Sequence, residues 1–401
     1  MKSKKLMLLG GIRYLLPVIK AAHEQGYYVI TADYLPDNIA HKYSDEYINA
    51  NITDQKAILK VAQEKNIDGI MSFGVDPGVV TASYVQHKMG LPTFGPHDSV
   101  KILQDKAHFR QFLKEHCFNV PKAKGYQHYE EAAKDIDFFR WPVIVKPVDS
   151  AGSKGVTRLD SPALLQTAFA HALQFSISKH VIIEEFIEKS GCSSDSDCFS
   201  IDGKLVIATF SSQRFDIAAD NPYTPSGYSW PSTFTKQQEA ELASEIQRLL
   251  TLLDMRTTVY NVETRIGIDG KPYIMEVSPR GGGNRLSEMV RFMTGADMVT
   301  GAVRAAVGDS VFLHQSVPKG YWAEIILHAD NTGQFVELAI NKDFKEKYVY
   351  ETDLWVEQGT VVETFTGANK AIGTLVLKFD TKEAMERAMT QQREWVKVVV
   401  K

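Results

Sequence analysis

Cysteine is scarce in this chain, which has three cysteines among 401 residues, and they occupy positions 117, 192 and 198. Their number is odd and they lack C-x-x-C spacing, so neither a disulfide framework nor a zinc site is indicated. We expect three small packing residues and a reducing, cytoplasmic environment. A long hydrophobic run is also missing near the start: L-M-L-L-G-G-I is far too short to span a bilayer. No small-residue cleavage site follows it, so we expect a buried first strand and no membrane partner.

An excess of charge of either sign is absent as well. Lys and Arg number 45, Asp and Glu number 49, and the net charge is −4. This balance gives no electrostatic case for nucleic acid as a partner. The hydrophobic content of 44% and the charged content of 23% are typical of a soluble globular protein. The length allows several domains, and a homodimer is the default expectation for the assembly.

Three familiar motifs are not found. Gly10 and Gly11 follow the first apolar run, but no third glycine completes G-x-G-x-x-G, so a nicotinamide site is disfavoured. Lys146 precedes its neighbouring glycines, whereas the lysine of a G-x-x-x-x-G-K-[ST] loop follows them. G-x-S-x-G is missing too, so the sequence gives no sign of a side-chain nucleophile.

Apolar runs and helical patterns alternate over the first ninety or so residues, which predicts βαβ units and an open parallel sheet. A long helix is expected from His97 or Ser99 to about His116, and short strands dominate after Tyr126. The predicted fold class is α/β and α+β, with an N-terminal parallel sheet and a strand-rich C-terminus. The expected divisions are 1–95, a linker helix over 96–124, a lid over 125–190, a metal-binding part over 191–310, and 311–401.

Two glutamates flank an Asp-Gly turn in the segment from Tyr260 to Asn284. Asp269-Gly270 predicts a two-residue type I′ hairpin, in which paired residue numbers sum to 539. Glu263 would then face Glu276, Arg265 would face Ile274, and Asn261 would face Ser278. Like charges in such positions are destabilising, and no base is apparent nearby, but a hard cation such as Mg²⁺ removes the penalty. The alternative is a solvated strand face that carries two acids.

Three further segments bear on the chemistry. Lys146 ends an apolar strand before a loop with Gly152, Gly155 and hydroxyl side chains, where backbone N–H groups could close on phosphate oxygens. The run V-I-I-E-E-F-I-E from Val181 fits a strand exit that could hold a purine edge. In S-P-R-G-G-G-N-R, the guanidinium of Arg280 suits a carboxylate or a transferring phosphate. Each segment alone is also compatible with an ordinary loop or strand end.

In this order, the four segments resemble the ATP-grasp superfamily, most closely its carboxylate–amine ligases. These include the L-amino-acid ligases, phosphoribosylamine–glycine ligase and the carbamoyl-phosphate-synthase-like ATP-binding fold. The resemblance implies ATP and Mg²⁺ as cofactors, with Mn²⁺ as an alternative. The implied ATP-binding residues are Lys106, Lys146, Ser150, Gly152, Ser153, Gly155, Glu184, Glu185, Phe186 and Ile187. The implied metal ligands are Glu263, Glu276 and Ser278. Arg280 would be catalytic, and the implied substrate contacts are Arg280, Gly282 and Arg214.

The activity implied is an ATP-dependent ligase that joins a carboxylate to an amine through an acyl phosphate and releases ADP and phosphate. Two features depart from the family pattern: Ser278 occupies a position that is commonly asparagine, and Ser193 one that is usually a ribose-binding glutamate. The alternatives are a bicarbonate-activating enzyme of the carboxylase type and a non-catalytic ATP-binding regulator. The expected partners are a small carboxylate and an amine, whose identities the sequence does not give.

Overall fold

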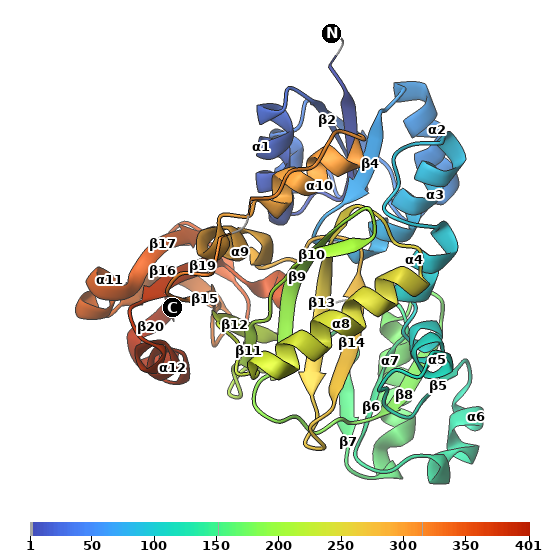
Figure 1. Cartoon of the computed structure of the whole chain (residues 1–401). Helices are drawn as coiled ribbons and strands as arrows, with labels where there is room; N and C mark the ends of the chain where they lie inside the picture. Colours follow the sequence, from blue (N-terminus) through green and yellow to red (C-terminus); the bar gives the residue numbers. More distant parts are fainter. Residues whose placement is uncertain (1–2, 151, 315) are drawn as a thin grey trace.

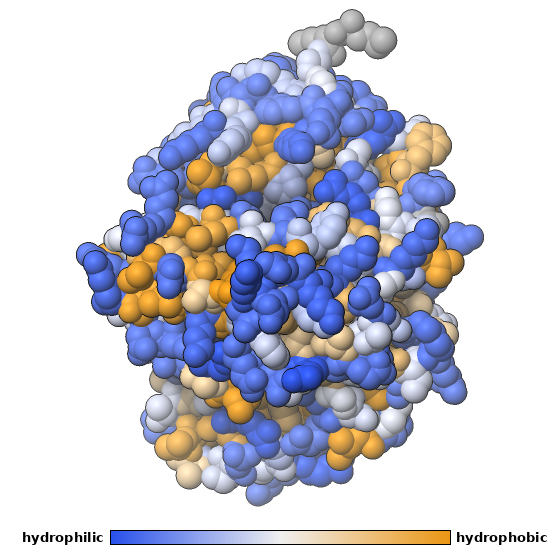
Figure 2. Space-filling model, turned by 90° about the vertical axis from the view of Figure 1, so that its left-hand side faces the viewer, coloured by the Kyte–Doolittle hydropathy of each residue, from blue (hydrophilic) through white to orange (hydrophobic). Residues whose placement is uncertain are grey.

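The computed structural model describes residues 3–150, 152–314 and 316–401. The chain forms an N-terminal layer, a central sheet, a small lid sheet and a strand-rich C-terminal lobe, arranged as shown in Figure 1. Viewed from the side of the C-terminal strands, the surface is largely hydrophilic with scattered apolar patches (Figure 2). No helix within the described ranges is long and apolar enough to cross a membrane.

The N-terminal layer is a parallel sheet, as the sequence predicts, with the strand order β3-β2-β1-β4. Its apolar strands pack on helices that carry one buried stripe each. The strands are β1 (Lys5–Leu9), β2 (Tyr28–Asp33), β3 (Glu46–Asn49) and β4 (Gly69–Ser72), and the helices are α1 (Leu16–Glu24), α2 (Gln55–Lys65) and α3 (Val79–Met89). The short 3-10 helices are η1 (Arg13–Leu15), η2 (Ile39–Lys42) and η3 (Asp76–Gly78).

The predicted linker helix is two helices, α4 (His97–Gln104) and α5 (Lys106–Glu115). The break lies at Asp105, which has an extended backbone and accepts hydrogen bonds from the N–H groups of Ala107 and His108. A side chain that caps the second helix therefore ends the first. The break places Lys106 at the first position of α5, where its backbone N–H donates to the carbonyl of Val148.

The lid is an antiparallel sheet with the strand order β5-β8-β6-β7. It packs on helix α7 through a small core of its own that contains Val143, Val145, Phe169 and Ile183. The elements are β5 (Ala123–Tyr126), α6 (Tyr129–Lys134), η4 (Ile136–Phe138), β6 (Val143–Pro147), β7 (Thr157–Leu159), η5 (Pro162–Leu164), α7 (Leu165–Phe175) and β8 (Val181–Glu185).

The central sheet has the order β10-β9-β13-β14 and packs on the capped helix α8. Its elements are β9 (Ser194–Ile201), β10 (Lys204–Ala208), α8 (Lys236–Leu252), β13 (Thr258–Ile266) and β14 (Pro272–Ser278). The hairpin between β9 and β10 turns through Asp202 and Gly203, which both have positive φ, as a two-residue type I′ turn requires.

The second Asp-Gly hairpin differs from the prediction. Only Gly270 has positive φ there, and the N–H of Gly267 donates to the carbonyl of Lys271, so the loop has three residues. Arg265 consequently pairs with Tyr273 and not with Ile274. A bulge between Glu263 and Thr264 on the paired ladder then restores the predicted register, because Met275 is the extra residue on β14.

The C-terminal lobe contains two antiparallel sheets, β11-β12-β15-β19-β17 and β18-β16-β20. Strands β11 (Ser212–Phe215) and β12 (Pro225–Trp230) join it from the middle of the chain (Figure 1). Helix α10 (Met298–Ala306) packs on α1 and β4 of the N-terminal layer, whereas helix α9 (Leu286–Thr294) packs on β9, β15 and α10. The remaining elements are β15 (Tyr321–Leu327), β16 (Gly333–Ile340), α11 (Lys342–Tyr348), β17 (Val349–Leu354), β18 (Val361–Val362), η6 (Ala368–Lys370), β19 (Gly373–Phe379), α12 (Lys382–Thr390), α13 (Gln392–Trp395) and β20 (Val396–Val400).

Candidate functional site

A row of acidic residues crosses the central sheet. Glu263 on β13 pairs with Glu276 on β14, as the sequence predicts, and on its other side with Asp195 on β9. Directly paired residues project from the same face of a sheet, so the three carboxylates lie side by side. Asp195 is therefore a third member of the row, and the alternation S-D-S-D from Ser194 was the signal for it in the sequence.

The expectation that no base lies near the glutamates is wrong. The Nζ of Lys106 is 3.4 Å from Oε1 of Glu276, and a guanidinium nitrogen of Arg265 is 3.8 Å from Oε1 of Glu263. Among the described residues, no base forms an ion pair with Asp195, which accepts a hydrogen bond from the side chain of Asn261 at 2.7 Å. Burial and the charge of Glu263 raise the pKa of the Asp195 carboxyl to about 7.

The acid row fits a hard cation. Oxygen ligands from one or two carboxylates are what Mg²⁺ commonly takes in phosphate-binding sites, and a cation would relieve the crowding that raises the pKa of Asp195. The neighbouring row on the same face contains Asp197, Asn261 and Ser278. Asp197 accepts hydrogen bonds from the backbone of Gly282 and from the hydroxyl of Ser287.

Ser278 is the weakest of the three predicted metal ligands on geometry. Its hydroxyl is buried, donates to Asp76 at 2.8 Å and accepts from the side chain of Gln104 at 2.9 Å. Both interactions hold the oxygen within the protein and leave one lone pair for any further bond.

A buried charge network lies between the acid row and the lid. Lys146 and Arg110 both form ion pairs with Glu184, and the Nε of Arg110 lies 2.9 Å from Oε2. Burial alone would raise the pKa of Glu184, but the two bases hold it well below its ordinary value. Arg110 also donates to the carbonyl of Met275 at 2.8 Å, so it joins the lid strand to the bulge beside Glu276.

At the strand exit predicted to hold adenine, several polar groups are already bonded within the protein. Glu184 turns its carboxylate to Lys146 and Arg110, so its side chain does not line a purine pocket. The backbone N–H groups of Glu185 and Phe186 already donate to carbonyls of Lys122 and Pro142. Among the described residues, the N–H of Ile187 has no such partner, and the carbonyl of Ile187 accepts from Arg265 at 3.0 Å. Ile187 is therefore the position with a donor available to a ligand.

The glycine loop reaches back toward the acid row. The backbone carbonyl of Ser150 accepts a hydrogen bond from Lys106 Nζ at 3.0 Å, and the hydroxyl of Ser153 donates to the carbonyl of Tyr223 at 3.1 Å. Gly152 has φ +69°, and a Cβ there would contact nothing within 4 Å. A side chain at this position would therefore stand in open space. Ala151, within the predicted lid loop, lies outside the described residues.

Arg280 has a partner that the sequence did not reveal. Its guanidinium donates twice to Asp76, from Nε at 2.8 Å and from Nη2 at 2.6 Å, and it is buried. Asp76 keeps the pKa of Arg280 raised although burial opposes this. The glycines after Arg280 are needed because neighbouring side chains occupy the space of a Cβ. A Cβ on Gly281 would collide with Phe73, and one on Gly282 would crowd Asp197. The N–H of Gly282 is bonded to Asp197, which leaves it unavailable to a substrate.

Arg214, the remaining predicted substrate contact, lies on β11. It donates to the hydroxyl of Ser229 at 3.0 Å and pairs with Glu386 at 2.7 Å. Lys189 is a neighbouring base that the sequence did not single out, and its Nζ lies over the ring of Phe215 at 5.0 Å. Burial and then the charge of Arg265 lower the pKa of Lys189.

Residues 139–288 match the model of the ATP-grasp domain, and this span contains the acid row, Lys146 and the glycine loop. The chain contains an ATP-grasp domain. The match confirms the resemblance on which the predicted site residues depend, while their individual roles remain predictions.

Known proteins extend the comparison. The large chain of carbamoyl phosphate synthase from Ralstonia nicotianae is 23% identical over 343 residues, which cover 80% of this chain and 31% of that protein. The chain thus spans about a third of that curated relative. The L-amino acid ligase from Bacillus licheniformis has a TM-score of 0.83 at 17% identity, with 100% of both chains covered.

A third relative is the biotin carboxylase domain dimer of a 2-oxoglutarate carboxylase from Hydrogenobacter thermophilus, solved with MgADP, ADP and bicarbonate. Its TM-score is 0.75 at 16% identity, and the likeness covers 100% of this chain and 92% of that one. At these identities the solved structures establish the shared fold, which includes the parallel N-terminal sheet and the strand-rich C-terminus predicted from the sequence.

Proposed function

We propose that this protein is an ATP-dependent ligase that joins a carboxylate to an amine. The observation that carries the proposal is the acid row of Asp195, Glu263 and Glu276, which lies beside Lys106 and the glycine loop within an ATP-grasp domain. These carboxylates would hold Mg²⁺, which would supply positive charge to neutralise the phosphates of ATP.

The reaction would proceed in two steps. An oxygen of the substrate carboxylate attacks the γ-phosphorus of ATP, the bond to the β-phosphate oxygen breaks, and ADP leaves from the acyl phosphate. The neutral amine nitrogen then attacks the acyl carbon, the bond from that carbon to the phosphate oxygen breaks, and the one proton that the nitrogen loses passes to solvent. Neither step needs a side-chain nucleophile, which agrees with the absence of one from the sequence.

The basic residues would position and neutralise the anions. Lys106 lies between Glu276 and the glycine loop, so its ammonium can follow the transferring phosphate. Lys146 is preorganised by Glu184 at the mouth of the lid sheet, within the ATP-grasp domain. Arg280, oriented by Asp76, would hold the acid or stabilise its acyl phosphate. Fixed charges of this kind supply most of the catalysis in phosphoryl transfer.

The test is release of ADP by purified protein with ATP, Mg²⁺ and a panel of amino acids and small carboxylates. We expect ADP and phosphate to form only when an acid and an amine are both present. Glu276→Gln should lower the rate of this release by about 10²–10³-fold, whereas Glu383→Gln, at an exposed position on α12, should not change it. Release of AMP would indicate adenylation and would contradict the proposal, as would background ADP release with every substrate pair.

A second candidate is activation of bicarbonate. It is favoured by the likeness to the biotin carboxylase domain, whose structure holds bicarbonate with MgADP. Bicarbonate would replace the organic acid in the first step, and the product would be carboxyphosphate. ADP release that depends on bicarbonate and needs no organic acid would support this candidate over the first.

The non-catalytic alternative is favoured by the state of Ser278, whose hydroxyl is already bonded to Asp76 and Gln104. A regulator would bind ATP tightly without turnover, and Glu276→Gln would leave its response to ATP unchanged. Calorimetry of ATP binding, combined with the ADP assay, distinguishes a non-catalytic regulator from a ligase.

A further inference from the structure

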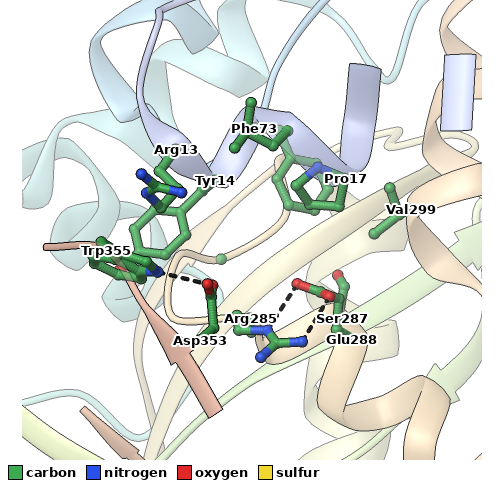
Figure 3. Close-up of a pocket in the computed structure, with 12 residues that line it drawn as sticks. Arg13, Tyr14, Pro17, Phe73, Arg285, Ser287, Glu288, Val299, Asp353 and Trp355 are labelled. Atoms are coloured by element: carbon green, nitrogen blue, oxygen red, sulfur yellow. Dashed lines mark hydrogen bonds and ion pairs between the residues drawn. The ribbon is translucent and has the colours of Figure 1, made fainter. Parts of the chain in front are cut away.

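One cavity, of about 190 Å³, adjoins the predicted substrate residues, because Gly282 is among the residues that line it (Figure 3). A different cavity, of about 610 Å³, lies in the C-terminal lobe and is lined by residues of β15 and β20. Asp216, His328, Asp330 and Arg393 also line it, and the last three lie beyond the residues that match the ATP-grasp domain. The proposed function assigns no role to this second cavity.

Three side chains in the second cavity have the composition of a metal site. A carboxylate oxygen of Asp216, a ring nitrogen of His328 and a carboxylate oxygen of Asp330 all lie within 4.8 Å of one another. Asp216 follows β11 and the other two follow β15, so segments more than a hundred residues apart meet here. One imidazole with two carboxylates suits Zn²⁺ and similar transition-metal ions, whereas Mg²⁺ takes oxygen ligands.

The imidazole of His328 directs a lone pair at the carboxylates. Its Nδ1 lies 2.7 Å from the carbonyl oxygen of Ile326, which can only accept, so Nδ1 carries the hydrogen. In the neutral ring, Nε2 then has the lone pair, and it faces Oδ2 of Asp216. The side chain is 7% exposed, and its ring stacks on Phe365, which fixes its orientation. Two buried acceptors therefore face each other, and a cation between them would satisfy both.

The distance between these two acceptors also fits a metal ion. Nε2 of His328 lies 3.3 Å from Oδ2 of Asp216, whereas a charge-assisted N–H to carboxylate bond is about 2.7–2.9 Å long. The His23–Asp45 pair of the same protein has such a bond, at 2.9 Å. Two ligands of a tetrahedral zinc ion, each about 2.0–2.1 Å from the metal, are about 3.3–3.4 Å apart. The spacing at His328 is the spacing of two zinc ligands.

Arg393 supplies the positive charge at the two carboxylates in this structure. Its Nη2 lies 2.6 Å from Asp216 and 2.8 Å from Asp330, so one guanidinium nitrogen stands between the acids. The side chain of Arg393 is 45% exposed and that of Asp330 is 57% exposed, so this edge of the cluster is open to solvent. The other oxygen of Asp216 accepts the N–H of Ala218 at 3.0 Å, which orients the carboxylate independently of Arg393.

We propose that Asp216, His328 and Asp330 form a site for a transition-metal ion such as Zn²⁺, and that Arg393 takes its place when the metal is absent. His328 supplies Nε2, each aspartate supplies one oxygen, and the cavity leaves room for water as a fourth ligand. The bound metal joins the end of β11 to the end of β15 and stabilises the C-terminal lobe. This inference does not depend on the proposed ligase function.

The test is zinc binding by the purified chain without a histidine tag, after removal of metal with a chelator. ZnCl₂ is titrated by calorimetry in excess Mg²⁺, which is expected to fill the acid row and has little preference for imidazole. We expect one Zn²⁺ per chain, and a higher unfolding temperature because the ion binds the folded state. His328→Gln should weaken zinc binding by more than about 100-fold, since loss of an outer partner alone costs about 10–100-fold. His23→Gln, which removes a histidine paired with a single aspartate, is the control and should leave zinc binding unchanged.

Arg393→Gln gives a test of the opposite sign. Removal of the competing guanidinium should tighten zinc binding by about 10–100-fold, the scale of a charged hydrogen bond. Weaker zinc binding in this variant would overturn the role of Arg393 as a competitor.

Absence of zinc binding in both wild-type and Arg393→Gln protein would overturn the site, and the cluster would then be an ion-pair network. Equal zinc affinity in wild-type and His328→Gln protein would also overturn it. If His328→Gln does not fold, Asp330→Asn replaces it, because that carboxylate is more than half exposed. Asp330→Asn should weaken zinc binding, and an unchanged affinity would contradict the assignment.

Discussion

Glu276 has one acidic and one basic neighbour: it pairs with Glu263 on the adjacent strand and lies 3.4 Å from the ammonium of Lys106. Neutralising it by Glu276→Gln removes a ligand for the cation while leaving the strand pairing intact. We expect ATP turnover to fall by about 10²–10³-fold, the usual scale for loss of one group that stabilises transition-state charge. Initial rates of ADP release at saturating Mg²⁺ measure this. Turnover within threefold or so of wild type would show that the acid row does not hold the metal.

Glu184 offers a second test at the residue scale, of stability rather than catalysis. Its side chain and that of Arg110 are each 3% exposed, and Lys146 is a third member of the network. Glu184→Gln leaves two buried bases without a counter-charge, so we expect a loss of about 3–5 kcal/mol in the free energy of unfolding. Denaturant unfolding measures the loss, with Glu188→Gln, whose side chain is 49% exposed, as the control.

The pH dependence follows from the same group. The pKa of Glu184 is lower in the folded protein than the ordinary value of about 4.3 in the unfolded chain. The unfolded state therefore takes up the proton first, and the stabilisation, fully present at neutral pH, is lost as the pH falls below about 4. In Glu184→Gln, this part of the loss of stability at acidic pH should not occur. Unfolding curves from neutral to acidic pH that run parallel in both proteins would contradict the assignment.

At the scale of elements, the break between α4 and α5 sets the position of Lys106. Asp105 caps α5 through two backbone N–H groups, so Asp105→Ala should cost about 0.5–2 kcal/mol of stability. It should also raise the KM for ATP, because Lys106 is the first residue of the capped helix. Asp105→Asn retains a capping oxygen and is the control. If Asp105→Ala destabilised the protein but left the KM for ATP unchanged, the cap would not be needed to position Lys106 for ATP.

Elements also show how far the sequence predicts the site. Residue patterns identify the parallel N-terminal sheet and the ladder position of Glu263 opposite Glu276. In the structure, Asp202-Gly203 forms a two-residue turn. The same dipeptide at Asp269-Gly270 forms a three-residue loop, and the bulge at Met275 compensates for the shift. Local preference determines which residues enter a turn, but the length of the loop depends on the packing of both strands. No local signal reports that packing.

The side chains that hold the site residues in place could not be predicted from the sequence for a different reason. Asp76 lies about two hundred positions before Arg280, and Arg110 meets Glu184 and Met275 from a helix that is far from both in the chain. These contacts depend on how the N-terminal layer, the central sheet and the lid pack together. Periodicity and spacing carry no information on such distant pairs, so these partners could not be predicted from the sequence.

At the scale of the whole molecule, the lid sheet should respond to the nucleotide. Lys154 is exposed on the glycine loop, which lies next to Lys106 and the acid row. If the loop closes over ATP, MgATP should slow tryptic cleavage after Lys154 several-fold, because closure of such loops excludes other molecules from the site. Mass spectrometry of the fragments measures this, with cleavage after Lys342, 86% exposed on α11, as the internal control. Equal protection at both lysines would show a general effect of ATP rather than closure of the lid.

The fate of labelled oxygen tests the central claim most directly, since an acyl phosphate shares one oxygen between the acid and the transferred phosphoryl group. The carboxylate substrate that supports ADP release is supplied with ¹⁸O in both oxygens, and the released phosphate is examined by mass spectrometry or ³¹P NMR. The proposed mechanism predicts one ¹⁸O atom in each released phosphate, and the same label in the much smaller amount of phosphate that Glu276→Gln releases. Phosphate without label, or label recovered in AMP, would contradict it.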